Sequence, residues 1–494
     1  MTAPVIVPLR EVPDLSAIAG ALPARYPFLL ESAADGPLDR YSLLLRCSGE
    51  RLVLHGDGRL SGPASLAPAE AGTADGFLDR LDRWYRSLAQ GNGATAELPF
   101  VGGWFLYLGY ELAGEIEPRL NLPTADDGLP VALAARCEGA VLIRHGAPHE
   151  AALIAEDETL MARMERELAG IDRNAHREPG RETDGKTDGK TGRDANRDGD
   201  AGAGAAPSGL DRLEADPAAE FEARVRRIKD YLLAGDVFQV NLSRAWRGRL
   251  ARPRDPVRLY RSLRAANPSP FGGLMLIGDR AVVSSSPERL VEVRGRDVQT
   301  RPIAGTHPRA ADPEEDRRLS RRMLAHPKER AEHIMLIDLE RNDLGRVCEA
   351  GSVEVNELMV LETYAHVHHI VSNVRGRLRD VMTPVDAVRA VFPGGTITGC
   401  PKVRCMEIIA ELEGRGRGAY TGSMGYLDRA GNLDLNILIR TMVLSPERLS
   451  FRTGAGIVAD SEPRREVAET VHKARGLLAA LGGGSLASAE VEPC

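Results

Sequence analysis

The stretch Gly235-Asp-Val-Phe-Gln-Val-Asn-Leu-Ser-Arg244 contains the clearest secondary-structure pattern of the chain. Apolar and polar side chains alternate over residues 238–243, which is typical of a half-buried strand. Gln239 and Asn241 therefore share one strand face, which we expect to point out of the core. Residues 216–235 predict a helix before the strand, because they combine a helix-start signal, an apolar stripe at helical spacing and a final glycine.

Strand and helix patterns continue after this stretch without a regular alternation of one strand and one helix. Strands are predicted at residues 274–277 and 281–284, and a hairpin is predicted at residues 290–300. Further helices are predicted at residues 314–324, 328–339, 401–412 and 462–481. Because no βαβ unit repeats, the sequence predicts an α/β fold of the mixed α+β kind, with mixed or antiparallel sheets and surrounding helices.

A low-complexity segment precedes this region. Residues 172–209 contain no Val, Leu, Ile, Met, Phe, Trp or Tyr, and Thr-Asp-Gly-Lys occurs twice among them. Such a segment cannot bury enough apolar surface to offset the entropy lost on ordering. The predicted organisation is an amino-terminal domain at 1–170, a flexible linker at 171–215, a catalytic domain at 216–482 and a disordered tail at 483–494.

Composition excludes several classes of protein. The 494 residues carry a formal charge of −7 without a basic stripe, so we expect no nucleic-acid partner. We expect no signal peptide and no membrane association, since no apolar run is long enough for either. The six cysteines form no CxxC pair or framework spacing, which indicates reduced thiols in a cytoplasmic protein.

Two pairs of glutamates are the first candidate site. Glu329 and Glu332 lie three residues apart in one predicted helix, and Glu466 and Glu469 do so in another. Each pair therefore projects from one helical face, and Lys473 continues the second row. Four carboxylates beside a lysine suit a divalent cation and a multiply anionic substrate. A solvated helix face is the alternative, and it is the commoner fate of glutamate.

Two glycine-rich segments are candidates for anion binding. Gly454-Ala-Gly-Ile-Val-Ala459 matches GxGxxA, but the next helix is expected only near residue 462, so we reject a dinucleotide fingerprint. A glycine turn whose backbone approaches an anion remains open. Residues 394–402 lack the Lys-Ser/Thr of a phosphate loop, and this motif alone favours an ordinary turn before a helix.

The motifs taken together resemble the chorismate-utilising enzymes, in particular component I of aminodeoxychorismate synthase and component I of anthranilate synthase. The matching runs are Gly235 to Arg244, Ser285 to Glu288, Arg301 to Thr306, Lys328 to Arg346, Phe392 to Glu413 and Gly454 to Ala474. Before the linker the match is weaker and rests on residues 29–32 and 102–110. The resemblance implies a two-layer anthranilate-synthase-component-I-like fold that binds chorismate and Mg²⁺ in a cleft.

The resemblance also implies roles for individual residues. Glu332 and Glu469 are the expected principal Mg²⁺ ligands, with Glu329 and Glu466 acting through water. The expected catalytic residues are Glu288 as the general acid for the C4 hydroxyl, together with His369, Gln239 and Lys473. The expected substrate-binding residues are Thr396, Tyr420, Arg440, Gly454, Ala455, Gly456, Ala304 and Thr306. A tryptophan site is expected at Leu30, Glu31 and Ser32.

The position of Gln239 bears on the nucleophile. Relatives that add water to chorismate carry a lysine base there, and a glutamine cannot take up a proton, so the resemblance favours ammonia. The chain lacks a GxCxG segment for glutamine hydrolysis, and a separate glutamine amidotransferase subunit is therefore the expected partner.

The two amination branches differ at a few positions. Ala304 stands where many aminodeoxychorismate synthases carry a lysine nucleophile, and alanine is usual in anthranilate synthase. Asn241 and residues 392–399 resemble the aminodeoxychorismate branch, and residues 267–273 depart from the tryptophan-pocket motif of the other. We therefore predict synthesis of 4-amino-4-deoxychorismate for 4-aminobenzoate and folate. Anthranilate synthesis is the alternative, and a non-catalytic regulatory homologue is a minor one.

Overall fold

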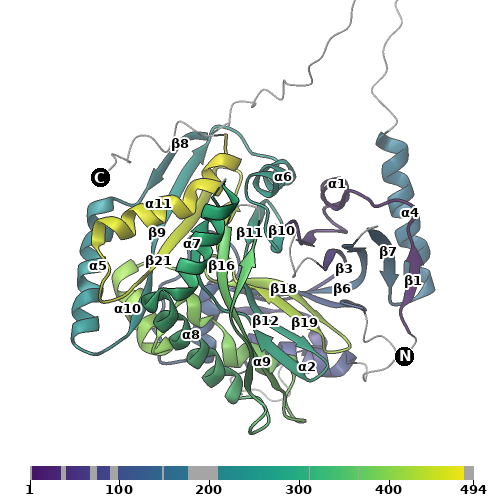
Figure 1. Cartoon of the computed structure of the whole chain (residues 1–494). Helices are drawn as coiled ribbons and strands as arrows, with labels where there is room; N and C mark the ends of the chain where they lie inside the picture. Colours follow the sequence, from purple (N-terminus) through teal and green to yellow (C-terminus); the bar gives the residue numbers. More distant parts are fainter. Residues whose placement is uncertain are drawn as a thin grey trace, which may run out of the picture.

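The structure is a computed structural model of the whole chain (Figure 1). It describes residues 3–34, 40–66, 75–89, 98–146, 149–175, 210–310, 312–364 and 367–482. In these ranges, eleven α-helices surround an extensive sheet whose longest strand pairings are antiparallel. The predicted mixed α/β class with antiparallel sheets and surrounding helices is confirmed.

The amino-terminal part contributes seven strands and four α-helices to the described ranges. The strands are β1 (Val5–Pro8), β2 (Phe28–Glu31), β3 (Tyr41–Leu54), β4 (Leu60–Ser61), β5 (Gly103–Leu108), β6 (Ala132–Arg144) and β7 (Glu150–Ala155). The helices are α1 (Leu15–Ala21), α2 (Phe77–Leu88), α3 (Ala113–Ile116) and α4 (Glu158–Ala175), with 3₁₀ turns η1 (Ala64–Leu66) and η2 (Tyr110–Leu112).

The carboxyl-terminal part contributes the remaining elements. Its strands are β8 (Leu210–Ala215), β9 (Gln239–Leu250), β10 (Phe271–Ile277), β11 (Arg280–Ser286), β12 (Arg289–Arg294), β13 (Asp297–Thr300), β14 (Ile303–Pro308), β15 (Glu354–Thr363), β16 (Val367–Arg377), β17 (Gly399–Cys400), β18 (Ser423–Asp428), β19 (Leu433–Asn436), β20 (Thr441–Leu444) and β21 (Arg448–Ile457). Its helices are α5 (Ala218–Leu233), α6 (Pro256–Ala266), α7 (Pro313–Ala325), α8 (Pro327–Gly345), α9 (Pro384–Val391), α10 (Lys402–Glu413) and α11 (Pro463–Ala480), with the 3₁₀ turn η3 (Gly395–Ile397).

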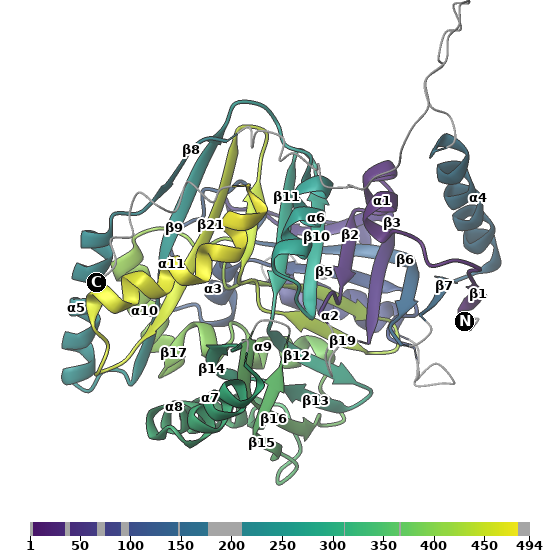
Figure 2. The same cartoon turned by 45° about the horizontal axis from the view of Figure 1, so that its top comes forward.

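Strands from both parts of the chain pair with each other. Strand β2 pairs with β10, where Leu29 lies opposite Leu274, and β5 pairs with β18, where Leu106 lies opposite Gly425. Figure 2 shows β2 and β3 beside β10 and β11. The two parts therefore share one hydrogen-bonded sheet, and the domain boundaries proposed from the sequence stay predictions.

The predicted linker overlaps described secondary structure at both of its ends. Helix α4 continues to Ala175, and β8 covers Leu210–Ala215 and pairs with β9. Leu210 and Leu213 lie just beyond the segment that lacks apolar residues, and both pack against a hydrophobic core. Residues 176–209 of the predicted linker and the whole predicted tail, 483–494, lie outside the described residues.

Strand β9 begins at Gln239, one residue later than the alternation predicts, and it is buried on both faces. Val240 and Leu242 pack into an apolar cluster formed with α5 and α10, whereas Gln239 and Asn241 lie on the opposite face and are also buried. Phe238 was expected on the core side. It precedes the strand instead and is 68% exposed, because Val237 fills the corresponding place in the core.

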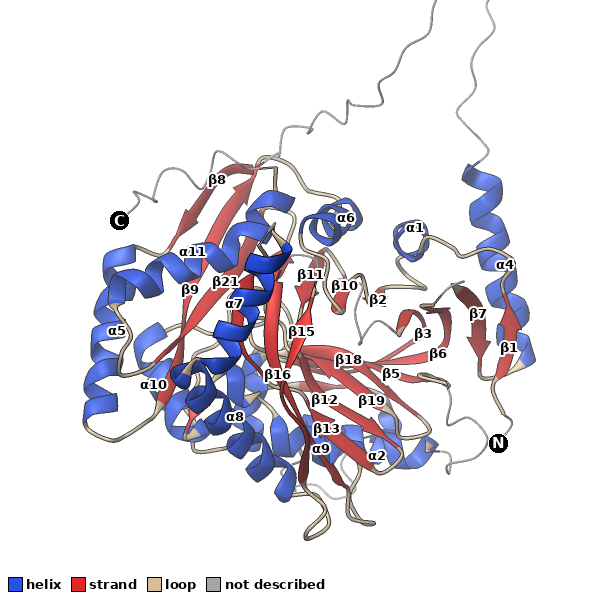
Figure 3. Ribbon diagram, in the orientation of Figure 1, coloured by secondary structure: helices blue, strands red, loops and turns tan. Residues whose placement is uncertain are grey.

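The helices predicted after β9 are present as α7, α8, α10 and α11, and α8 runs farther than predicted, to Gly345. Figure 3 shows α5, α10 and α11 around the long pair β9–β21. These helices pack against the strand pair and hold it in place. The other face of the pair points to the interior of the protein. Among the helices described, none combines the length and apolar composition that crossing a bilayer requires.

Candidate active site

A cavity of about 500 Å³ gathers most of the residues singled out from the sequence. Its walls come from β9, α8, η3, β21, α11 and the turn between β11 and β12. The predicted residues that line it are Gln239, Glu288, Ala304, Glu329, Glu332, His369, Thr396, Tyr420, Arg440, Gly454, Ala455, Gly456, Glu466, Glu469 and Lys473. Thr306 belongs to β14 next to this cavity, but its side chain lies outside the described residues. The chemical roles of all of these residues remain predictions.

The cavity wall built by β9 and β21 depends on two glycines, which have no side chain. Gly454 pairs with Ser243, and Gly456 pairs with Asn241. A Cβ atom on Gly454 would collide with the Tyr420 hydroxyl, and one on Gly456 would collide with the Gln239 amide. Only glycine permits so close an approach. These two glycines leave room for polar groups, and they do not form a dinucleotide turn.

Glu288 is the buried carboxyl of the site. It follows β11, is 5% exposed, and its burial raises its pKa to about 7, although Thr396, Lys473 and Arg440 oppose the shift. Glu288 Oε1 and the nearby Thr396 Oγ1 both lack a partner in hydrogen-bond geometry within the described part of the chain. A carboxyl group that is partly protonated near neutral pH can act as a general acid.

His369 lies in β16 on the same cavity. Burial, together with the positive charge of Arg440, lowers its pKa to about 4. The ring makes an edge contact with Tyr364, with centroids 5.7 Å apart. The imidazole is therefore neutral at neutral pH, and it suits hydrogen bonding to a ligand rather than donation of a proton as a cation.

Arg440 and Tyr420 form the part of the cavity suited to a carboxylate. Arg440 lies between β19 and β20 with a φ of 50°, in the left-handed region that is costly for an arginine. Burial lowers its pKa, but Glu288 and Glu469 oppose the shift and the guanidinium stays charged. Burial raises the pKa of Tyr420 to about 12, so this residue offers a neutral hydroxyl.

Gln239 and Glu332 connect β9 to α8. The Gln239 amide donates from Nε2 to Glu332 Oε1 at 3.0 Å. The other amide atom, Gln239 Oε1, is buried and has no hydrogen-bond partner among the described residues, and the same holds for Asn241 Oδ1. Gln239 therefore supports a carboxylate and presents an amide oxygen, which cannot serve as a general base.

The four glutamates line one cavity from two helices. Glu329 and Glu332 come from α8, and Glu466 and Glu469 come from α11. Lys473 Nζ lies 3.5 Å from Glu469 Oε1 and donates to the Gly454 carbonyl at 2.9 Å. The carboxylate oxygens of the four glutamates are the ligands that Mg²⁺ prefers, so the residue types fit this ion. In the described ranges, however, no three or more His, Cys, Asp or Glu residues form a ready metal-binding group.

Arg452 was missed in the sequence. It lies in β21 two residues before Gly454, is 8% exposed and lines the cavity. Sequence spacing alone gave no signal, because an arginine within a strand is usually on the solvent side. The available clue was the position of Arg452 two residues before Gly454, the first glycine of the glycine-rich segment.

Leu30, Glu31 and Ser32 line a different cavity, of about 520 Å³. Glu31 is held there by the Tyr260 hydroxyl at 2.6 Å and by Arg264 at 2.9 Å. Ser32 Oγ is buried without a partner in the part of the chain that is described. Binding of tryptophan at this second cavity stays a prediction.

Known proteins similar to this chain match it over most of its length or over about half of it. The chain is 40% identical over 468 residues to an anthranilate synthase component I-like protein of Synechocystis, covering 94% of this chain and 87% of that protein. It is 44% identical over 471 residues to anthranilate synthase component 1 of Streptomyces coelicolor, covering 92% and 83%. It is 49% identical over 261 residues to aminodeoxychorismate synthase component 1 of Bacillus subtilis, covering 53% and 55%.

Solved structures agree with these relationships. Anthranilate synthase component I from Streptococcus pneumoniae superposes with a TM-score of 0.72 at 31% identity, covering 88% of this chain and 91% of that one. The model of the family described as chorismate binding enzyme matches residues 60–479. The chain therefore belongs to the chorismate binding enzyme family.

Proposed function

We propose that the chain is component I of an aminodeoxychorismate synthase, which converts chorismate and ammonia to 4-amino-4-deoxychorismate and water. The observation that carries the proposal is the pairing, across one cavity, of a buried acid and an amide. Glu288 has a pKa raised to about 7, and Gln239 presents an amide where a water-adding enzyme needs a base. This combination supports amination over hydration.

The reaction requires that the C4–O bond of chorismate breaks and a C4–N bond forms. Glu288 donates its proton to the departing hydroxyl group, which leaves as water. The incoming ammonia acquires a positive charge as it bonds, and loss of one of its protons returns Glu288 to the acid form. Arg440 and Tyr420 bind a carboxylate of the substrate, with Arg440 acting as a two-pronged donor.

Mg²⁺, when held by Glu332 and Glu469 with support from Glu329 and Glu466, would neutralise the ring carboxylate of chorismate. The four side chains line one cavity, and this supports the assignment. A glutamine amidotransferase subunit is the proposed source of ammonia, since the chain has no GxCxG segment of its own. A cytoplasmic location is part of the same proposal.

Anthranilate synthesis is the second candidate. Ala304 is buried in β14 and lines the cavity, so no lysine adduct can form at this position. Relatives named anthranilate synthase component 1 also align over most of this chain. The features that favour the first candidate are Asn241, which lines the cavity, and the Gly394-Gly395 pair.

The test is product identification. The purified chain is incubated with chorismate, Mg²⁺ and an ammonium salt, and the products are separated by chromatography with mass detection. We expect 4-amino-4-deoxychorismate. Anthranilate with pyruvate would replace the first candidate by the second, and isochorismate would contradict the role given to Gln239.

A further inference from the structure

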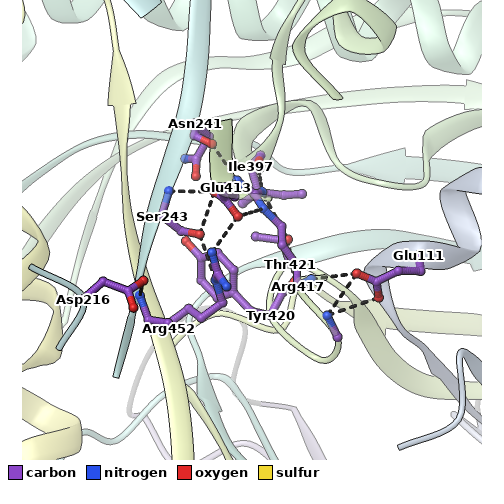
Figure 4. Close-up of polar contacts among 12 residues, drawn as sticks. Glu111, Asp216, Asn241, Ser243, Ile397, Glu413, Arg417, Tyr420, Thr421 and Arg452 are labelled. Carbon is purple, nitrogen blue, oxygen red and sulfur yellow. Dashed lines mark hydrogen bonds and ion pairs between the residues drawn. The ribbon is translucent and has the colours of Figure 1, made fainter. Parts of the chain in front are cut away.

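A buried ionic cluster adjoins the cavity, since several of its members line the cavity wall. Figure 4 shows the contacts within this cluster. Its centre is Glu413, the last residue of α10, whose side chain is fully buried. Arg417 and Arg452 both contact this carboxylate, with side chains that are 1% and 10% exposed. Two guanidinium groups thus share a single carboxylate.

Arg417 joins three separate segments. It donates from Nε and Nη2 to Glu413 at 3.1 and 2.7 Å, from Nη2 to the Asn241 carbonyl at 2.7 Å, and from Nη1 to the Ile397 carbonyl at 3.2 Å. Its guanidinium also lies 5.6 Å from the centre of the Tyr420 ring. Asn241, Ile397 and Tyr420 all line the cavity, whereas Arg417 does not. Arg417 therefore fixes the cavity wall from behind.

Arg452 is the cation of this cluster that reaches the cavity. It donates from Nη2 to Glu413 Oε2 at 2.6 Å and from Nε to Ser243 Oγ at 2.9 Å. Ser243 in turn donates to Glu413 from its backbone N–H and its hydroxyl. These contacts hold Arg452 in one orientation beside Gly454, which is the glycine that the Tyr420 hydroxyl approaches.

The charge of Arg452 is only partly neutralised. Glu413 remains ionised, because Arg417 and Arg452 hold its pKa down against a large burial effect. Asp216 also feels Arg452, but it is paired with Arg247 at 2.7 Å. Glu111 faces the other side of the cluster, where it accepts from the backbone N–H groups of Arg417 and Gly418. A positive potential therefore remains at the cavity wall next to Tyr420.

We propose that Arg452 is a further carboxylate-binding residue of this cavity and that Glu413 and Arg417 are its positioning residues. The proposal rests on the proposed function in so far as the ligand is the dicarboxylate chorismate. Arg452 strengthens the attraction for the substrate carboxylate that Arg440 and Tyr420 receive. Its guanidinium is held in advance by Glu413 and Ser243, so little ordering is left to the binding step.

The experiment compares Arg452→Met, Arg452→Lys and a control, Arg448→Met. Arg448 lies at the exposed start of the same strand. Calorimetric titration with chorismate in the absence of ammonia gives Kd, and assays with ammonium give KM and kcat. We expect Arg452→Met to raise Kd and KM tenfold to a hundredfold with a smaller change in kcat, Arg452→Lys to restore most of the affinity, and Arg448→Met to match the wild type.

Several outcomes separate this inference from the proposed function. A Kd for Arg452→Met within twofold of the wild-type value would overturn the inference while chorismate amination stands. A wild-type chain that neither binds nor converts chorismate would overturn the proposed function. Should Arg452→Met lose the native fold, Arg452→Gln keeps an amide donor for Glu413 and replaces it in the comparison. A fall in kcat alone, without a change in Kd, would also contradict a binding role.

Discussion

The two cavities described above are similar in volume and differ in how their polar groups are satisfied. In the second cavity, lined by Leu30 and Ser32, most of the charged side chains are paired. Arg289 makes two 2.9 Å contacts with Asp434, and Arg294 contacts Glu292 at 3.1 Å. In the candidate active-site cavity, Gln239 Oε1, Asn241 Oδ1, Glu288 Oε1 and Thr396 Oγ1 are buried, and none of them meets full hydrogen-bond geometry with a described residue.

A buried polar atom that makes no hydrogen bond costs free energy. A cavity wall with four such atoms can therefore bind a polar ligand that supplies the missing hydrogen bonds. In the second cavity, apart from Ser32 Oγ, the polar groups are largely satisfied by ion pairs within the fold. We therefore expect substitutions in the two cavities to have different effects. Substitutions in the candidate active-site cavity should lower kcat more than they lower the free energy of unfolding. Substitutions of ion-paired residues in the second cavity should do the reverse.

Glu288→Gln should have the largest effect. It removes the proton donor while it keeps the size of the side chain, so kcat should fall about 10²- to 10⁴-fold. Unfolding in urea should show a free energy equal to or higher than that of the wild type, because a costly buried carboxyl has been removed. Wild-type turnover in this variant would contradict the assignment of Glu288 as the acid.

Asp434→Asn tests the second cavity. It breaks a half-buried two-point ion pair with Arg289, and the free energy of unfolding should fall by about 2–4 kcal/mol. Below the melting temperature, kcat should stay close to the wild-type value. A large loss of kcat in a variant of normal stability would remove the distinction between the two cavities.

Glu332→Ala should weaken Mg²⁺ binding about 10- to 100-fold and also release the Gln239 amide. Titration of turnover against Mg²⁺ concentration gives the apparent affinity. Asp338→Ala is the matched control, because Asp338 is an exposed carboxylate on the same helix. Equal Mg²⁺ dependence in both variants would disprove the metal assignment.

The pH profile should follow the protonation of Glu288. Because its pKa is about 7 and the protonated form is the active one, kcat/KM should fall tenfold per pH unit above this value. Measurements from pH 6 to pH 9 with the concentration of free ammonia held constant separate this effect from the titration of ammonium. A profile that rises to pH 9 would be inconsistent with an acid of this pKa.

Ser32→Ala should have the smallest effect. It removes a hydroxyl that has no hydrogen-bond partner among the described residues of the second cavity. The free energy of unfolding should therefore be nearly unchanged, and kcat should stay within about twofold of the wild-type value. Calorimetry with tryptophan tests the predicted site in the same variant. We expect weaker binding than in the wild type, and identical binding would exclude a role for this hydroxyl.

Sequence patterns predicted the local structure well and the long-range contacts poorly. Helices α7, α8, α10 and α11 follow from apolar periodicity and capping residues, and the residues of the candidate active-site cavity follow from resemblance to a family. The hydrogen bond from Gln239 to Glu332 joins positions 93 residues apart, and no local pattern encodes it. Arg452 was missed for the same reason, since its partner Glu413 is on another element.

Errors in the prediction also have identifiable physical causes. Phe238 belongs to an apolar alternation, but the strand starts one residue later and leaves its ring exposed. The linker was drawn to residue 215, across β8, because a short strand such as β8 gains its stability from pairing with β9 and not from its own composition.

The pairing of β2 with β10 and of β5 with β18 has a consequence for inheritance. Each part of the chain completes the sheet of the other, so neither can be exchanged for a distant counterpart without matching its partner's edge. Either part alone would leave strand edges of the shared sheet without their partners, so we expect each part to depend on the other in order to fold.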